Sequence, residues 1–149
     1  MDKPIIPSSK LWKKFGEYFP YAVVDVIIFN ADGNFLLTKR SIIPYKNKWH
    51  LPGGMIQKGD RMKNTAIRIA KKEVNLKVQV DGFLGVYEVF TPHRHDISHA
   101  FITHVLSGKI KLDFQASDAK FFKNPPRNMI PIQRKMLLDA KSFLKKSRQ

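Results

Sequence analysis

The stretch that decides the fold reads WHLPGGMIQKGDRMKNTAIRIAKKEVNL and runs from Trp49 to Leu76. Its double glycine, Gly53 and Gly54, lets the backbone approach a ligand closely, because glycine has no Cβ. Asp60 follows six residues later and can serve as the N-cap of a helix from Asp60 to Val74. The stretch therefore predicts a glycine loop that leads directly into a helix.

One face of that helix carries the chemistry. Positions 69, 72 and 73 are neighbours, because residues three and four apart share a helix face. Ile69, Lys72 and Glu73 occupy them. One carboxylate beside one ammonium supports a single Mg²⁺ at most, since this hard cation prefers oxygen ligands. Lys72 has two interpretations: its ammonium replaces a second cation and pairs with substrate phosphate, or it is a solvated lysine.

The spacing of this stretch resembles the Nudix signature, G-x5-E-x7-R-E-U-x-E-E-x-G-U, where U is a bulky aliphatic residue. Four of the defined positions are matched, by Gly54, Asp60, Arg68 and Glu73. Ile69 and Lys72 stand where most members carry Glu. The resemblance implies an α+β fold, an α/β/α sandwich with a mixed central sheet. It also implies that Arg68 orients the carboxylate and braces the loop, whereas spacing alone also fits a solvated arginine.

A longer region, roughly residues 23–122, resembles the GDP-mannose mannosyl hydrolase branch of the superfamily. The likeness rests on FLLTKR followed by W-x-L-P-G-G, on MIQKGD and on FLGVYEVF. That branch binds one Mg²⁺ through a glycine carbonyl, one Glu and a Gln from a late loop. The resemblance places these ligands at Gly53, Glu73 and Gln115, with Mn²⁺ as the alternative ion. It places nucleotide or phosphate contacts at Asp25 and Arg40.

The chain departs from that branch at three functional positions. Ala116 stands where the branch has the His thought to be the general base. Met55 replaces an Arg that stabilises the leaving diphosphate, and Val89 replaces a His. Losing a general base typically costs about 10²- to 10⁴-fold in rate. The sequence therefore predicts a substitute base, a different reaction, or reduced or lost activity.

A basic segment is the candidate for the missing parts. His93, Arg94 and His95 follow Thr-Pro in what the pattern predicts as a loop between two strands. Histidine can exchange a proton near neutral pH, and arginine can bind phosphate as a fork. We interpret His93 and His95, with Arg68, as catalytic candidates and Arg94 as a phosphate contact. An exposed loop without function is the alternative.

Composition restricts the partners. The 27 Lys and Arg residues outnumber the 12 Asp and Glu residues, so the net charge of +15 favours anionic ligands. The basic residues are scattered, which favours a small nucleotide over nucleic acid. No run reaches the roughly 20 apolar residues that span a bilayer, so no membrane partner is expected. With no cysteine and no secretion signal at the start, we expect a cytoplasmic protein, and a homodimer stays open.

We expect residues 1–149 to form one domain in which helices cover a sheet. Residues 1–20 would be an N-terminal helical extension, 54–76 the Nudix box region and 132–146 a C-terminal helix. The patterns predict a hairpin with an Asp-Gly turn and several further elements. These elements are a helix at Ser9–Tyr18, strands at Lys77–Phe90 (interrupted near Asp81-Gly82), Ser98–Leu106 and Lys120–Phe122, and a helix at Ile132–Lys146.

The leading hypothesis is an Mg²⁺-dependent Nudix hydrolase whose substrate is a nucleoside diphosphate linked to another group. A nucleotide sugar such as GDP-mannose fits best. The first alternative is a catalytically impaired module that binds nucleotide or RNA. The second is a nucleoside triphosphate pyrophosphohydrolase.

Overall fold

The structure is a computed structural model and describes residues 5–147. Within that range the chain forms three helices and seven strands. In chain order they are α1 (Ser9–Tyr18), β1 (Tyr21–Phe29), β2 (Phe35–Arg40), β3 (Trp49–His50), β4 (Gly53–Met55), α2 (Met62–Val74), β5 (Lys77–Thr91), β6 (Arg94–Ser107), β7 (Ala116–Phe122) and α3 (Pro131–Ser147).

All seven strands belong to one mixed sheet, in which β1 is central. The main path is β3-β2-β1-β6-β5; β4 also pairs with β1, and β7 also pairs with β2. The β1–β6 pair is parallel and the other pairs are antiparallel. The sequence of β1, YAVVDVIIF, is buried at every position but one. A nearly continuous apolar run is what a strand covered on both faces requires.

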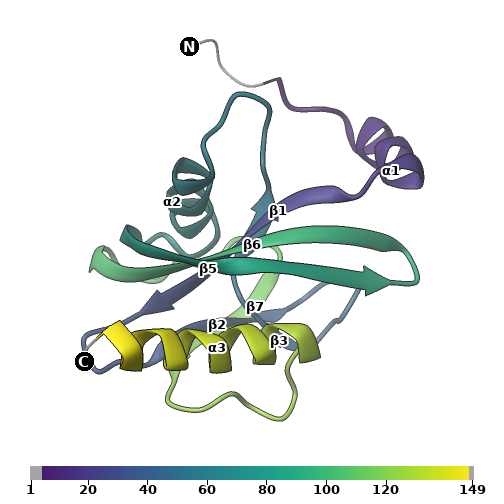
Figure 1. The fold of residues 1–149 in the computed structure, drawn as a ribbon. Coiled ribbons are helices and arrows are strands. Elements are labelled where there is room, and N and C mark those ends of the chain that lie inside the picture. Colours follow the sequence, from purple (N-terminus) through teal and green to yellow (C-terminus); the bar gives the residue numbers. More distant parts are fainter. Residues whose placement is uncertain (1–4, 148–149) are drawn as a thin grey trace.

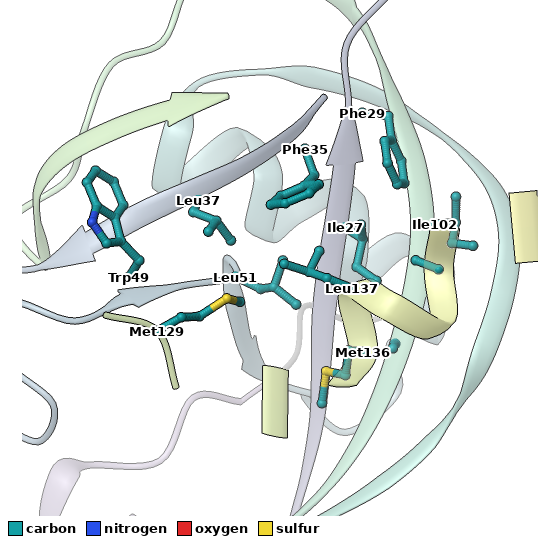
Figure 2. Packing of buried hydrophobic residues seen from close by; sticks show 12 residues of the cluster. Ile27, Phe29, Phe35, Leu37, Trp49, Leu51, Ile102, Met129, Met136 and Leu137 are labelled. Atoms are coloured by element: carbon teal, nitrogen blue, oxygen red, sulfur yellow. The ribbon is translucent and has the colours of Figure 1, made fainter. Parts of the chain in front are cut away.

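Helices cover the two faces of the sheet, with α2 on one side and α3 on the other (Figure 1). Figure 2 shows Met136 and Leu137 of α3 among the side chains of Ile27 and Leu51 on one face. On the opposite face Ile69 and other residues of α2 pack against the β1 positions that point the other way. The predicted α+β fold, an α/β/α sandwich with a mixed sheet, is confirmed.

The N-cap prediction for the central helix is wrong. Helix α2 begins at Met62, and its N-cap residue, Arg61, makes no capping hydrogen bond with its side chain. Asp60 instead accepts a hydrogen bond from Thr65 Oγ1 at 3.1 Å and lies 3.5 Å from Arg68 Nε. These two side chains, from the first two turns of α2, bind the carboxylate that the spacing assigned to the cap.

Two other local predictions need correction. Strand β5 continues through Asp81-Gly82, where a register shift against β6 replaces the expected interruption. The predicted loop at His93, Arg94 and His95 is also wrong for two of its residues. Thr91 pairs directly with Arg94, so Arg94 and His95 belong to β6 and the turn contains only Pro92 and His93. The hairpin at β1–β2 and the helices α1 and α3 are confirmed.

Adjacent leucines in α3 provide a test of the packing. Leu137 is fully buried, whereas Leu138 is 54% exposed. We expect Leu137→Ala to lower the free energy of unfolding by about 2–5 kcal/mol, because it leaves a cavity in the core. Leu138→Ala should change it by about 0.5 kcal/mol or less. Urea unfolding measures both values, and equal losses would contradict the packing.

Candidate active site

A cleft of about 480 Å³ opens beside the first half of β1, where β4, α2 and the β5–β6 hairpin meet. All but one of the site residues predicted from the sequence line it. Those that do are Asp25, Arg40, Gly53, Arg68, Lys72, Glu73, His93, Arg94 and Gln115. The structure thus brings together residues that lie up to 90 positions apart in the chain.

The pairing of β1 with β4 forms the floor of the cleft. Asp25 lies opposite Gly53 in this antiparallel pair. A Cβ on Gly53 would collide with Asp25 Oδ1 and would lie 3.1 Å from the carbonyl oxygen of Val24, so any larger residue would require Asp25 to move. Ser98 donates a short hydrogen bond to Asp25 Oδ2. Burial raises the pKa of Asp25 to about 6, although the Ser98 hydrogen bond opposes that shift.

Glu73 projects from α2 towards the same floor. Burial, reinforced by the negative charge of Asp113, raises the pKa of Glu73 to about 8. A hydrogen bond from the Gly53 backbone and the charge of Lys72 lower the pKa in opposition. Within residues 5–147 neither Glu73 nor Asp25 forms a salt bridge. Asp25 is buried and Glu73 half-buried, and each is influenced by nearby cations without an ion pair within 4 Å.

Two arginines border the cleft, each anchored through its Nε. Arg40 Nε donates to the carbonyl oxygen of Pro44 at 2.6 Å. Burial lowers the pKa of Arg40, while the charge of Glu73 raises it. Arg94 Nε donates to Asp96 Oδ1 at 2.7 Å. This anchoring fixes the direction of each guanidinium, which suits binding of an anionic ligand.

Arg68 and Lys72 occupy different parts of the helix surface. Arg68 donates to the carbonyl oxygen of Met55 at 3.2 Å and lies near Asp60, so it ties α2 to the loop after β4. That contact is the kind that the bracing interpretation requires. Lys72 is exposed at the rim of the cleft, next to Glu73.

Only one of the two candidate histidines lines the cleft. His93, in the hairpin turn, lines the cleft. His95 is absent from the cleft lining: its ring stacks on Phe90 at a centroid distance of 4.2 Å, and its Nε2 lies 3.7 Å from Glu88 Oε2. Alternation along β6 explains the difference, because Arg94 and Asp96 point to the cleft and the residue between them does not.

Gln115 reaches the cleft through contacts between two loops. Its carbonyl oxygen accepts from the Ser41 backbone at 2.9 Å, and the Ser41 hydroxyl donates to Phe114. Its own N–H donates to Asp113 Oδ1 at 3.0 Å. The neighbouring Ala116 begins β7 and does not line the cleft. The position of Gln115 thus depends on the loop after β2.

Sequence reasoning missed several polar and aromatic residues of the cleft, notably Asp96, Ser98, His50 and Trp12. For the first two a signal was present: Arg94, Asp96 and Ser98 alternate along the chain, as side chains on one face of a strand do. For His50 and Trp12 the signal is absent from the local sequence. Their places follow from tertiary contacts.

The donor set of the cleft can be compared with the needs of a metal. Among the described residues no group of three His, Cys, Asp or Glu side chains could hold an ion. Glu73, Gly53 and Gln115 line the same cleft and carry a carboxylate, a backbone carbonyl and an amide oxygen. Mg²⁺ keeps several waters and is commonly bound through one or two carboxylates, so these residues fit one Mg²⁺ and not a cluster.

Fold and cleft together define a class of protein. Residues 20–137 match the NUDIX domain family, and the chain therefore belongs to that family. It is a Nudix hydrolase. Hydrolases of this family generally need a divalent metal such as Mg²⁺ and act on small nucleotide substrates. No helix in residues 5–147 is long and apolar enough to cross a membrane.

Two related proteins and one solved structure are similar to this chain over most of its length. An ADP-ribose pyrophosphatase of Methanocaldococcus jannaschii is 36% identical over 122 residues, which are 80% of this chain and 72% of that protein. The low-salt glycan biosynthesis protein Agl8 of Haloferax volcanii is 27% identical and covers 87% of this chain and 88% of its own. A MutT NUDIX hydrolase of Burkholderia pseudomallei has a similar fold, with TM-score 0.74, 20% identity, and coverage of 81% and 98%.

His50 gives a test by pH. Its Nδ1 lies 2.8 Å from the Leu51 carbonyl oxygen, so Nδ1–H donates and Nε2 accepts from the Thr38 hydroxyl at 3.0 Å. Burial lowers the pKa of His50 from 6.5 to about 4. The unfolded chain therefore binds a proton more readily, and stability is lost as pH falls from about 6.5 towards 4.

We compare the wild type with His50→Gln, which cannot titrate. The difference in free energy of unfolding between them should shrink by about 3 kcal/mol from pH 7 to pH 4. Urea unfolding across this range measures it, and shifts of other groups cancel in the comparison. A difference that stays constant with pH would show that His50 is protonated alike in both states.

Proposed function

We propose that this Nudix hydrolase cleaves a nucleoside diphosphate linked to a sugar, with one Mg²⁺ bound. The observation that carries the proposal is that the half-buried carboxylate Glu73 lines the same cleft as Gly53, Gln115 and two arginines. ADP-ribose, named for the relative at 36% identity, and GDP-mannose, named for the branch that the sequence resembles, both belong to this substrate class.

Glu73, the Gly53 carbonyl and Gln115 would hold the metal. When bound, Mg²⁺ neutralises phosphate charge and lowers the pKa of a water molecule. Arg40 and Arg94 would bind the diphosphate oxygens, because their fork geometry matches phosphate. Lys72, at the rim, adds a further positive charge. Arg68 keeps the loop after β4 against α2, so that Gly53 stays next to Glu73.

Proton transfer falls to groups of the chain itself. Ala116 offers no base, and His95 does not line the cleft. His93 does line it, and we assign it the role of exchanging a proton with the attacking water or the leaving group. Asp25 is buried beside Gly53 and contacts the nucleotide or sugar from the floor of the cleft. Its hydrogen bond with Ser98 fixes the direction of its carboxyl group.

A second candidate is a domain that binds nucleotide without turnover. Ile69 favours it, because this side chain is only 2% exposed and cannot serve as a ligand on the helix face that bears Glu73.

A panel of GDP-mannose, ADP-ribose, UDP-glucose and GTP, with Mg²⁺, Mn²⁺ or EDTA, separates these candidate functions. Nucleoside diphosphate plus free sugar indicates attack at carbon, and nucleoside monophosphate plus sugar phosphate indicates attack at phosphorus. Binding without product favours the binding domain, and pyrophosphate from GTP alone favours triphosphate hydrolysis.

Glu73→Gln tests the metal site directly. The amide keeps the shape of the side chain and removes its negative charge. We expect turnover and Mg²⁺ affinity each to fall by about 100-fold or more, since even outer partners of a metal ligand are worth 10- to 100-fold. Calorimetric Mg²⁺ titration and steady-state rates measure this. The matched control is Glu88→Gln, which removes an exposed carboxylate outside the cleft and should leave both values unchanged. Equal behaviour of the two variants would refute the assignment.

A further inference from the structure

Helix α1 lies outside the region that matches the family, yet it borders the cleft. The match begins at residue 20, after the end of α1 at Tyr18. Trp12 of this helix and Ile6, which precedes it, both line the cleft. Figure 1 shows α1 above the end of the β5–β6 hairpin, and α1 contacts β6. The helix is therefore placed to influence how the cleft binds its ligand.

Tyr21, the first residue of β1, takes its position from α1. Its hydroxyl donates to the carbonyl oxygen of Trp12 at 2.5 Å. Its ring lies 5.8 Å from the Trp12 ring and 5.7 Å from the Phe15 ring, measured between centroids. Gly16 faces the same hydroxyl so closely that a Cβ there would require the Tyr21 side chain to shift. Tyr21 is thus held on several sides by a single helix.

Arg94 in turn rests on Tyr21. Its guanidinium carbon lies 4.5 Å from the centroid of the Tyr21 ring, and its Nε is engaged by Asp96. Its two terminal nitrogens donate to no acceptor among residues 5–147. A guanidinium that is stacked and anchored at Nε loses little further freedom when it binds an oxyanion, so its open edge is prepared for phosphate.

We propose that Tyr21 is a positioning residue that, backed by α1, holds Arg94 against the phosphate of a bound nucleoside diphosphate. The proposal rests on the substrate class given under the proposed function. It makes the N-terminal helix part of the binding site of this chain. If α1 only covered the end of the sheet, altering it would change stability and leave nucleotide affinity unchanged.

The first experiment is a double-mutant cycle on the full chain. We measure the affinity for ADP and for GDP with Mg²⁺ by calorimetry for the wild type, Tyr21→Leu, Arg94→Ala and the double variant. Each single change should weaken binding roughly tenfold, the value of one hydrogen bond to a charged group. The double variant should bind no more weakly than Arg94→Ala, because Tyr21 acts through Arg94. Tyr21→Phe, which keeps the stacked ring, should recover most of the affinity.

Losses that add in the double variant, or a Tyr21→Leu chain that binds like the wild type, would overturn the proposal. Melting temperatures show whether each variant is folded at the temperature of the titration. In kinetics, the effect should fall on KM more than on kcat if the nucleotide is hydrolysed. Binding of ADP or GDP without hydrolysis of any panel substrate would defeat the proposed function and leave this inference standing. A wild type that binds neither nucleotide would overturn both.

Gly16→Ala tests the coupling without touching β1. Alanine favours a helix over glycine, so α1 itself should become more stable. Its methyl group, however, must displace the Tyr21 ring, because it would lie 2.6 Å and 2.9 Å from two ring carbons as well as against the hydroxyl. We expect nucleotide affinity to fall by severalfold although the helix is stabilised. Leu11→Ala, at a 56% exposed position of the same helix that does not line the cleft, is the matched control and should bind normally. If Gly16→Ala binds nucleotide as tightly as the wild type, α1 does not influence the binding site and the proposal is wrong.

Discussion

The close approach of β4 to β1 at Gly53 is the constraint on which the site depends. The Gly53 backbone lies against Asp25 on one side and forms a hydrogen bond with the Glu73 carboxylate on the other. A side chain at this position would displace Asp25, whereas glycine lets the loop bring α2 and its acidic residue close to the central strand. The rest of the sandwich keeps this contact in place: α2 packs on one face of β1 and α3 on the other.

Charge in the cleft is arranged so that the acids stay unpaired. Arg94 is paired with Asp96 and Arg68 with Asp60, whereas Asp25 and Glu73 form no salt bridge within residues 5–147. Desolvated carboxylates without a cation are costly to keep ionised, and the raised pKa values of both groups express that cost. A cation would relieve it. Arg40 and Arg94, whose Nε atoms are held by Pro44 and Asp96, add positive charge to the same cleft.

Much of this arrangement follows from the sequence, but not all. Periodicity predicts α1 and α3, the Asp-Gly turn predicts the first hairpin, and the spacing from Gly54 to Glu73 places the acid-bearing helix. The cap prediction for Asp60 is wrong because its carboxylate contacts the side chains of Thr65 and Arg68 on the following turns of α2. The side on which a β6 residue points is fixed by strand register, which separates His95 from Arg94. The sequence around Tyr21 does not indicate its contact with Arg94, because the residues that hold Tyr21 come from α1.

On α2, Ile69 contributes to the packing of the core, whereas Glu73 is the polar residue of the cleft. The side chain is buried in the core on the α2 face and lies 3.4 Å from where a Cβ on Gly54 would be. It therefore packs the glycine loop against α2 through apolar contact, at a position where a carboxylate would face a metal. Glu73, one turn further on, keeps the polar role, and Lys72 reaches solvent. With one carboxylate on this face, the proposed function assigns the orientation of the substrate to Arg40 and Arg94 more than to a cluster of ions. The contacts that hold these two arginines rigid then become important. For Arg94 they are the hydrogen bond to Asp96 and the packing on the Tyr21 ring.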